Sequence, residues 1–529
     1  MRARHHKVAI LLSVTLTGMA VLIIEITATR MLAPFFGNSI FTISSVIGIV
    51  LAALGLGYYA GGALADRKPS ERWFYSLIVI AGFSVMLLQL LNAVLLPRIA
   101  YKLSLINGPL IVSLLMFFLP ALFLAMLSPF AITLLHARAA GGGVGNASGL
   151  VFFWSTLGSI AGTLGTGFVL IPHWGIGNII VGVGSGLVLL GGVGLLITRT
   201  MPRIVPVGLA LLGLISGMGL RHMTVVEPRG VVFAADGLYE RIVIRDMPLQ
   251  GRTARVLWQD QNVSGGLYLD DGSMAFDYTK YFDLHRLFVP EVRTALAIGG
   301  GAYNVPRAIL LDSPRAIVDV AEIDPSLHSL ALRYFALPDD ARLRNHVIDG
   351  RRFLHDTAER YDLVFSDAYR SFVSAPPQFA TREFFSLARS KLREDGVLIA
   401  NFYGSLAPDS RAMIYSVLRT MRAAFPQVYV FATVGPESEE LQNFIFVGHN
   451  ASDPNKRMDL RRAAAVEFAY PMLKGLAARE LRPAQTLLAS HPVLTDDFAP
   501  LEYYAANAIR RYDATSTGRR ESSSRSRTR

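Results

Sequence analysis

Residues 295–301 read Ala295-Leu296-Ala297-Ile298-Gly299-Gly300-Gly301, a short apolar run that ends in three glycines. Such a run, closed by glycine, is typical of a buried strand that leads into a tight turn. Because glycine carries no side chain, a turn of three glycines lets a ligand approach the backbone closely. The stretch therefore predicts the first strand of a sheet, followed by a ligand-binding turn at Gly299, Gly300 and Gly301.

The same pattern of a strand followed by a turn recurs along the chain, with helical segments in between. The further apolar runs are residues 316–320, 346–348, 363–365 and 396–401, and a helix is expected over 381–392. Alternating strands and helices predict a parallel, doubly wound α/β sheet of the Rossmann type. Its ligand should lie at the carboxyl ends of the strands.

Acidic residues follow three of these strands, where the ligand is expected. Glu322 and Asp324 come about 20 residues after the glycine turn, a spacing that suits an acid bound to the two ribose hydroxyls of a nucleotide. Asp349-Gly350 and Asp367 follow the next two strands. A plainer alternative is that the glycines form only a tight turn and that the acids after the second strand cap a helix, which Pro325 would favour.

A small antiparallel unit is expected before the α/β domain. Its three predicted strands are residues 238–245, 255–258 and 266–269, and Asp270-Asp271-Gly272 closes the last one. These strands predict a leading β-hairpin unit in the soluble part of the chain.

The distribution of charge separates this soluble part from the N-terminal half. The first 222 of the 529 residues contain 13 Lys and Arg but three acids, whereas the remainder is almost balanced. Long uncharged runs dominate the N-terminal half, and about 20 apolar residues suffice to cross a bilayer. We expect seven membrane-spanning helices, at about 8–29, 39–64, 73–97, 108–135, 147–171, 176–198 and 203–221. The net charge of +11 therefore reflects the membrane half and gives no support for binding of nucleic acid.

Little in the sequence points to other chemistry. The absence of cysteine excludes disulfides and thiolate metal sites, and the 11 histidines show no paired metal-ligand spacing, so no metal is expected.

Glu25, near the end of the first span, is either part of an interfacial ion pair or a functional site. The Arg- and Ser-rich tail is expected to be disordered and attracted to anionic lipid. The expected parts are a membrane domain (1–222), the β-hairpin unit (223–290), the Rossmann-like domain (291–512) and the tail (513–529).

The soluble part resembles the spermidine synthase (polyamine aminopropyltransferase) family. The resemblance covers roughly residues 238–402 and rests on ordered motifs. They are Leu269-Asp270-Asp271-Gly272, Tyr281 with Asp283, Ile298-Gly299-Gly300-Gly301, Ala321-Glu322-Ile323-Asp324, Ile348-Asp349-Gly350, Tyr361-Asp362-Leu363-Val364-Phe365-Ser366-Asp367 and Leu392-Arg393-Glu394-Asp395-Gly396-Val397-Leu398. The whole chain is also similar to a membrane-fused, transporter-like subgroup, whose C-terminal signature residues 494–502 resemble.

The resemblance implies an enzyme that acts on a sulfonium nucleoside. The substrate would be decarboxylated S-adenosylmethionine, the acceptor a polyamine and the leaving group methylthioadenosine, with no separate cofactor. The substrate-binding residues would be the three glycines, Glu322 on the ribose, Asp349 and Gly350 on the adenine edge, and Asp324, Asp283 and Arg370. Asp367 would be the catalytic carboxylate beside the reacting carbon, and Tyr281 would line the acceptor pocket. Such a displacement needs alignment and a base that keeps an amine unprotonated.

Three positions depart from the family pattern. Ala302 replaces the Asp that usually follows the glycines, Arg370 replaces a second Asp of the acceptor site, and Phe282 replaces a histidine or glutamine. A pocket with two fewer carboxylates binds a polycation less well, and Arg370 would favour a carboxylate. An alternative is therefore a lyase that converts S-adenosylmethionine itself to methylthioadenosine and homoserine lactone. A further alternative is a non-catalytic nucleoside sensor or transporter component.

Two arguments about location conflict. Nine Lys and Arg lie on the side of the N-terminus, which predicts a cytoplasmic N-terminus in the inner (plasma) membrane. Seven spans then place the soluble part outside, whereas a cytoplasmic supply of S-adenosylmethionine favours the inside. The membrane half, embedded in the lipid bilayer, would move a substrate or product across it or hold the chain in a homo-oligomer. These alternatives stay open at the level of sequence.

Overall fold

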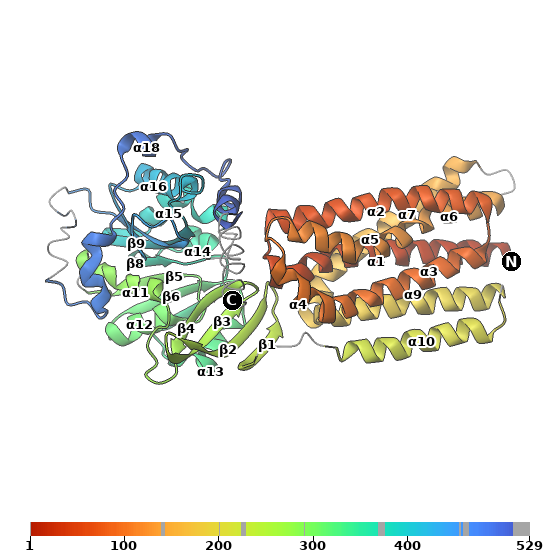
Figure 1. Ribbon diagram of the computed structural model, residues 1–529, viewed down its shortest axis with the longest axis horizontal. Coiled ribbons are helices and arrows are strands. Elements are labelled where there is room, and N and C mark those ends of the chain that lie inside the picture. Colours follow the sequence, from red (N-terminus) through yellow and green to blue (C-terminus); the bar gives the residue numbers. More distant parts are fainter. Residues whose placement is uncertain are drawn as a thin grey trace, which may run out of the picture. The chain divides into compact units, whose positions relative to one another are not determined.

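The computed structural model of the 529-residue chain forms two compact units, residues 1–228 and 229–529 (Figure 1). The structure describes residues 2–138, 143–199, 201–223, 229–289, 291–368, 376–453, 456, 458 and 465–510. Arg370 and the tail 513–529, about which the sequence makes predictions, lie outside these residues. Each unit buries a hydrophobic core of its own.

The N-terminal unit is helical throughout the part that the structure describes. Its helical segments are α1 (Arg2–Phe36), α2 (Ile40–Arg67), α3 (Glu71–Leu90), η1 (Leu91–Leu95), α4 (Leu96–Ile99), η2 (Ala100–Lys102), α5 (Gly108–Ala125), α6 (Leu127–Arg138), α7 (Val144–Gly165), η3 (Thr166–Leu170), α8 (Ile171–His173), α9 (Ile176–Thr198) and α10 (Ile204–Arg221). They form seven continuous helices long and apolar enough to cross a membrane: His5–Phe36, Ile40–Arg67, Glu71–Ile99, Gly108–Ala137, Val144–His173, Ile176–Thr198 and Ile204–Arg221. The prediction of seven long apolar helices is confirmed, and most extend a few residues beyond the expected runs.

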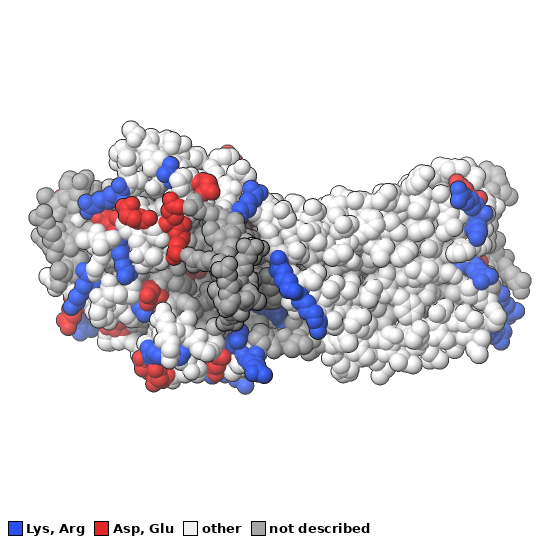
Figure 2. Space-filling view, viewed as in Figure 1, with Lys and Arg blue, Asp and Glu red and all other residues white. Residues whose placement is uncertain are grey.

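Small residues allow these helices to pack closely. A Cβ atom on Gly158 of α7 would lie 2.0 Å from the carbonyl oxygen of Thr15 in α1, and one on Gly61 of α2 would lie 2.4 Å from that of Met126. Large apolar side chains face outward, and Figure 2 shows Lys and Arg at the ends of this unit, with none across the middle of the face in view. Close glycine contacts inside and an apolar exterior are typical of helix bundles in lipid.

The C-terminal unit begins with a four-stranded antiparallel sheet. Its strands pair in chain order, β1 (Val231–Asp236), β2 (Arg241–Leu249), β3 (Arg252–Gln259) and β4 (Asn262–Tyr268). The sequence predicts three of these strands, and the structure adds β1. It also starts the next strand at Arg241 rather than Leu238, because residues 237–240 form the turn between β1 and β2, in which the Gly237 amide donates to the Glu240 carbonyl.

A seven-stranded sheet follows, in the order β10-β11-β9-β8-β5-β6-β7. Its strands are β5 (Thr294–Ile298), β6 (Ile317–Glu322), β7 (Leu343–Val347), β8 (Tyr361–Ser366), β9 (Leu392–Gly404), β10 (Gln427–Ala432) and β11 (Gln442–His449). Strands β5 to β9 run parallel, which confirms the predicted Rossmann-like fold. The antiparallel pair β10 and β11, which the sequence does not predict, extends the sheet beyond β9.

Helices cover both faces of this sheet (Figure 1). They are α11 (Asp277–Lys280), η4 (Tyr281–Leu287), α12 (Asn304–Asp312), α13 (Leu327–Tyr334), α14 (Gly350–Asp356), η5 (Pro377–Phe379), α15 (Arg382–Ser390), α16 (Ala412–Ala424), η7 (Pro471–Arg479) and α18 (Gln485–Ala489). Successive strand residues enter opposite cores, since Phe365 and Ile399 belong to the core that contains Tyr281, whereas Val364 and Leu398 belong to the other.

The register of the parallel strands brings the expected site residues to one edge. Ile298, the last residue of β5, pairs with Ala321 of β6 and with Ser366 of β8. The residues that come next in each strand, Gly299, Glu322 and Asp367, therefore lie along the same carboxyl edge of the sheet.

Candidate active site

The glycine turn after β5 adopts a backbone that only glycine takes easily. Gly299 and Gly301 have φ angles of +88° and +51°. The turn is fixed to the small sheet, since the amide of Ala302 donates to the carbonyl of Ser264 (2.9 Å) and the amide of Gly266 donates to Asn304 (2.9 Å). The β-hairpin unit thus holds the glycine turn in place.

Glu322 lies against this turn at the end of β6. One carboxylate oxygen accepts a hydrogen bond from the amide of Gly300 (2.7 Å) and the other from the amide of Asp324 (2.8 Å). Burial raises the pKa of Glu322, and the backbone hydrogen bonds oppose that rise. The carboxylate is therefore oriented by the backbone beside the glycine turn before any ligand binds.

Asp324 has one engaged and one unengaged oxygen. Its Oδ1 accepts from the amide (2.9 Å) and the hydroxyl (2.6 Å) of Ser326, while its Oδ2 is buried without a hydrogen-bond partner among the described residues. The capping alternative from the sequence thus fits one oxygen of Asp324, in a local turn. The other oxygen is available to a ligand or to water.

Asp349 forms the N-cap of α14. Its side chain accepts from the amides of Arg351 and Arg352, both at 3.0 Å. The neighbouring Gly350 packs on β5, where an added Cβ atom would lie 2.3 Å from Ile298. Close packing at Gly350 therefore brings the N-terminus of α14 next to the strand that carries the glycine turn.

Asp367 follows β8 and its amide donates to the carbonyl of Ile298 (3.0 Å), which places it on the other side of the glycine turn from β6. Its carboxylate accepts hydrogen bonds from Asn401 (2.9 Å) and from Tyr278. Burial raises the pKa of Asp367 to about 6, and these two hydrogen bonds oppose the rise. A partly buried carboxylate with such a pKa is ionised at neutral pH and can accept a proton.

Asn401 continues into a row of polar side chains that the sequence does not predict. Asn443 of β11 donates to the Oδ1 of Asn401 (2.9 Å), so Asp367, Asn401 and Asn443 form a chain across three neighbouring strands. The sequence does not reveal this row of side chains, because β9 and β11 pair antiparallel and the register of that pair cannot be read from either strand alone.

Tyr281 is buried, and its hydroxyl accepts a hydrogen bond from Arg479 (2.8 Å). Burial raises the pKa of Tyr281, and the guanidinium of Arg479 opposes this. Arg479 is 198 residues away in the sequence, at the end of η7, and no motif marks it. The structure thus adds a cation at the tyrosine that was expected to line an acceptor pocket.

Asp283, expected among the substrate-binding residues, has both oxygens engaged by protein. One accepts from Arg286 (2.5 Å) and the other from the amide of Ala469 (2.7 Å). The side chain is fully buried, and its hydrogen bond with Ala469 connects the segment before η7 to η4. Both oxygens of Asp283 thus make contacts within the protein, and its part in substrate binding stays a prediction.

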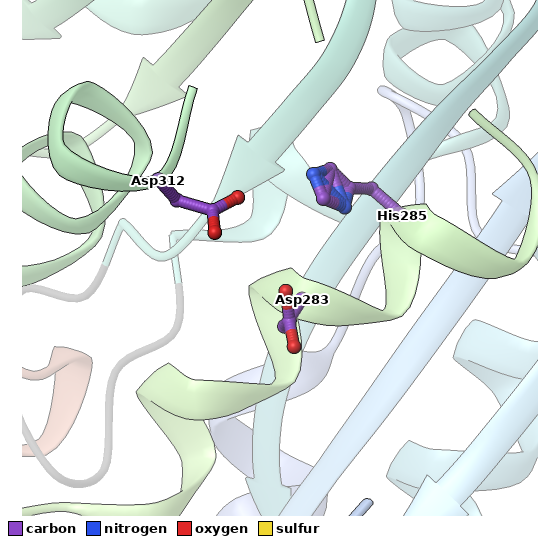
Figure 3. A group of neighbouring side chains, drawn as sticks. All are labelled: Asp283, His285 and Asp312. Carbon is purple, nitrogen blue, oxygen red and sulfur yellow. The ribbon is translucent and has the colours of Figure 1, made fainter. Parts of the chain in front are cut away.

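Asp283, His285 and Asp312 are close enough to hold a metal ion (Figure 3). Burial lowers the pKa of His285 to about 3, and its Nδ1 has no partner among the described residues. Arg286, however, pairs with both carboxylates of the group. One guanidinium thus already engages both carboxylates and offsets one of their two charges, so the cluster attracts a cation less than its three side chains suggest.

A salt bridge joins the C-terminal segment to α14. Both oxygens of Asp496 accept from Arg351 (2.8 and 2.6 Å), and one also accepts from the hydroxyl of Thr381 (2.8 Å). Arg351 reaches the carbonyl of Gln378 as well (3.3 Å). Residues 376–381, α14 and the predicted C-terminal signature are therefore tied together beside Asp349.

The departures Ala302 and Phe282 are both buried, at 2% and 1% exposure. Among the described residues, the glycine turn thus carries no carboxylate at position 302 that could receive an ammonium group. Arg370 falls in residues 369–375, outside the described part of the chain, so its prediction stays untested.

Comparison with known proteins finds sequence similarity over much of the C-terminal unit. Residues 282–457 match the spermine/spermidine synthase domain. A polyamine aminopropyltransferase of Vibrio vulnificus (strain CMCP6) is 27% identical over 289 residues, which is 51% of this chain and 90% of that protein. The C-terminal unit thus contains a spermine/spermidine synthase domain. The resemblance of the whole chain to a membrane-fused subgroup stays a prediction.

Two further proteins are similar to part of this chain. The eEF1A lysine and N-terminal methyltransferase of Mus musculus is 29% identical over 157 residues, 28% of this chain and 22% of that protein. The crystal structure of a probable spermidine synthase from Corynebacterium glutamicum ATCC 13032 has a TM-score of 0.41 and 18% sequence identity, and covers 52% of this chain and 99% of that one. Methyltransferases thus match a shorter part of the chain than the aminopropyltransferase does.

Proposed function

We propose that the C-terminal unit transfers an aminopropyl-type group from decarboxylated S-adenosylmethionine to an amine and releases methylthioadenosine. The observation that carries this proposal is the position of two carboxylates around one glycine turn. Glu322 accepts from the amide of Gly300, and the Asp367 amide donates to the carbonyl of Ile298. An acid on the ribose side and an acid on the reacting side are what a sulfonium nucleoside bound across the turn requires.

In this reaction the lone pair of the acceptor nitrogen forms a bond to the carbon next to the sulfonium. The carbon–sulfur bond breaks, its electron pair stays on sulfur, and neutral methylthioadenosine leaves. The amine proton passes to Asp367, whose pKa of about 6 keeps it ionised at neutral pH. Asn401 and Tyr278 hold that carboxylate in place, and alignment of nitrogen, carbon and sulfur supplies the rest of the rate gain.

The remaining predicted residues form or flank the proposed substrate site. Gly299 and Gly301 form the backbone turn that the nucleoside approaches, while Asp349 and Gly350 place the start of α14 beside it. Asp324, with one buried unpartnered oxygen, stands next to Glu322 on the ribose side. Tyr281 lies on the acceptor side.

A second candidate is the lyase reaction, and one observation favours it. Position 302 is a buried alanine, so the glycine turn has no carboxylate there that would repel the carboxylate that S-adenosylmethionine retains and the decarboxylated form lacks. In the lyase reaction the substrate carboxylate forms a bond to its own γ-carbon while the carbon–sulfur bond breaks. The products are homoserine lactone and methylthioadenosine.

Four incubations of the purified full-length protein separate these reactions. Each sulfonium nucleoside is supplied with and without putrescine, and methylthioadenosine is quantified. Release from the decarboxylated form only when an amine is present supports transfer. Release from S-adenosylmethionine without an amine supports the lyase, and no release in any incubation contradicts both the lyase reaction and transfer to putrescine.

We further propose that the N-terminal unit spans the inner membrane with its N-terminus in the cytoplasm. The seven apolar helices and the excess of Lys and Arg on the N-terminal side support this. Substrate supply favours a cytoplasmic catalytic unit, whereas seven crossings favour the opposite side. Alkaline phosphatase and a fluorescent protein fused in turn after Arg221 decide between the two, since each is active on one side only.

A further inference from the structure

We propose that Arg479 binds a carboxylate of the substrate, so that this site takes an α-amino acid group where a simple diamine would otherwise bind. The proposal rests on the proposed function, because it concerns the same displacement, and it names the chemical class of one substrate. Two sources share that chemistry, an acceptor amine that is also an amino acid and S-adenosylmethionine with its own carboxylate.

The sheet places Arg479 at the level of Asp367. Glu480, the next residue, forms a bridge with Phe431 of β10, and the amide of Leu481 donates to the carbonyl of Val430 (2.8 Å). Phe431 pairs with Ile445 of β11, which pairs with Asn401 of β9, the residue that donates to Asp367. The backbone of Arg479 therefore lies at the same edge, four strand intervals or about 19 Å from β8 along the sheet, and its side chain extends back to Tyr281.

The strand residues along this span face the same side of the sheet as Tyr281, whose hydroxyl accepts from Arg479. Phe365 and Ile399, two residues before Asp367 and Asn401, belong to the core that contains Tyr281, and so do Phe431 and Ile445. Since alternate strand residues share a face, Asp367 and Asn401 turn toward the same side as Tyr281. The chain from Asp367 through Asn401 to Asn443 then forms a polar path that leads toward the edge strand β10.

Two tyrosines connect the ends of the path. Tyr278 and Tyr281 are three residues apart across α11 and η4, which places them on one side of that helical turn. Tyr278 donates to Asp367, and Tyr281 accepts from Arg479 (2.8 Å). One short helical segment thus contacts the catalytic carboxylate and the guanidinium together.

The charge of Arg479 is not matched by a described carboxylate. Its one hydrogen bond within the described chain goes to Tyr281, whereas the nearby acids are engaged elsewhere, Asp277 with Lys280 and Glu480 with Arg482. A guanidinium has five N–H donors, so most of them remain for a ligand. The planar arrangement of those donors fits a carboxylate far better than it fits an ammonium group.

The rest of the described acceptor side does not offset this charge. Ala302 and Phe282 are buried apolar residues, and Asp283 is paired with Arg286. A diamine would bring a second positive charge toward a guanidinium that pairs with no described carboxylate, which costs binding free energy. A substrate with a carboxylate at that end would gain a charge-assisted hydrogen bond instead, worth about tenfold or more in affinity.

The test compares ligands that differ by one carboxylate. Putrescine and ornithine share a carbon chain, and decarboxylated S-adenosylmethionine and S-adenosylmethionine differ in the same way. Binding of each to the full-length protein is measured by calorimetry, with methylthioadenosine present for the amines, and methylthioadenosine release is measured in parallel. The variants are Arg479→Gln, Arg479→Lys and, as a matched control in the same segment, Arg482→Gln, which removes an exposed arginine paired with Glu480.

We expect the native protein to bind at least one carboxylated ligand about tenfold or more tightly than the matching ligand without the carboxylate. That preference should disappear in Arg479→Gln, persist in part in Arg479→Lys and be unchanged in Arg482→Gln. The pair that shows the preference identifies the acceptor or the donor as the source of the carboxylate. The proposal is overturned if putrescine and decarboxylated S-adenosylmethionine each bind as tightly as, or more tightly than, their carboxylated counterparts. It is also overturned if the preference for the carboxylated ligand survives Arg479→Gln in a folded protein. Absence of turnover with intact binding preference would contradict the proposed function alone.

Discussion

At the scale of single residues, the environment of Asp367 sets the expected pH dependence. A carboxylate acts as a base only when ionised, and burial raises the pKa of Asp367 to about 6. We expect the rate of methylthioadenosine release to rise with pH through an apparent pKa near 6, and not near the usual carboxylate value. A pH–rate profile of the native protein at saturating substrate checks this. A rate that is flat between pH 5 and 7 would contradict the role of Asp367 as base.

Gly300 provides a second prediction at this scale, from steric contact. An added Cβ atom would lie 2.5 Å from the ring of Tyr303, which is fully buried and held by Asn345 (2.5 Å). Since the ring cannot move away, Gly300→Ala should cost about 1–3 kcal/mol of folding stability and weaken nucleoside binding. Thermal unfolding and methylthioadenosine affinity measure the two effects. Gly435→Ala is the control, because nothing lies within 4 Å of its added Cβ atom.

At the scale of elements, the salt bridge between Arg351 and Asp496 should position α14. Asp496→Asn removes the charge from a contact that joins α14 to the C-terminal segment while it keeps the size of the side chain. Because Asp496 is 46% exposed, solvent screens the pair, and we expect a loss of about 1 kcal/mol. That loss should appear as a several-fold higher KM for the nucleoside with kcat little changed.

The control for this change lies on the same helix. Arg352→Gln removes one of the two side-chain partners of Asp356, in an exposed pair on α14, and should leave KM unaltered. If Asp496→Asn raises KM for the nucleoside no more than Arg352→Gln does, the bridge does not position the nucleoside site.

The elements also show which parts of the site the sequence can predict. Strand β5, the glycine turn and the acids after β6, β7 and β8 are local signals, because apolar runs and the residues that end them are contiguous. Arg479, Asn401 and Asn443 were missed, since their positions depend on the antiparallel register of β9, β11 and β10. The structural pairing of Asp283 was missed for a related reason, because its partner amide belongs to Ala469, far along the chain.

At the scale of the whole molecule, the two units should be separable. Residues 229–529 form one compact unit with their own cores on both faces of the large sheet. We expect this segment, produced alone, to unfold cooperatively and to gain a few degrees in Tm with saturating methylthioadenosine, because a ligand that binds the native state stabilises it. Differential scanning calorimetry with and without the nucleoside tests this. A segment that folds but shows no ligand-dependent shift would contradict a nucleoside site built within this unit.

The most direct test of the central claim is the rate of methylthioadenosine release by the full-length protein and by Asp367→Asn. Both sulfonium nucleosides are supplied, with putrescine and with ornithine, so that any acceptor preference is covered. A positioned base contributes about 10²–10⁴ in rate, so the native protein should release methylthioadenosine at least about a hundredfold faster than the variant at equal nucleoside binding. No release by the native protein, or an equal rate in Asp367→Asn, would contradict the account.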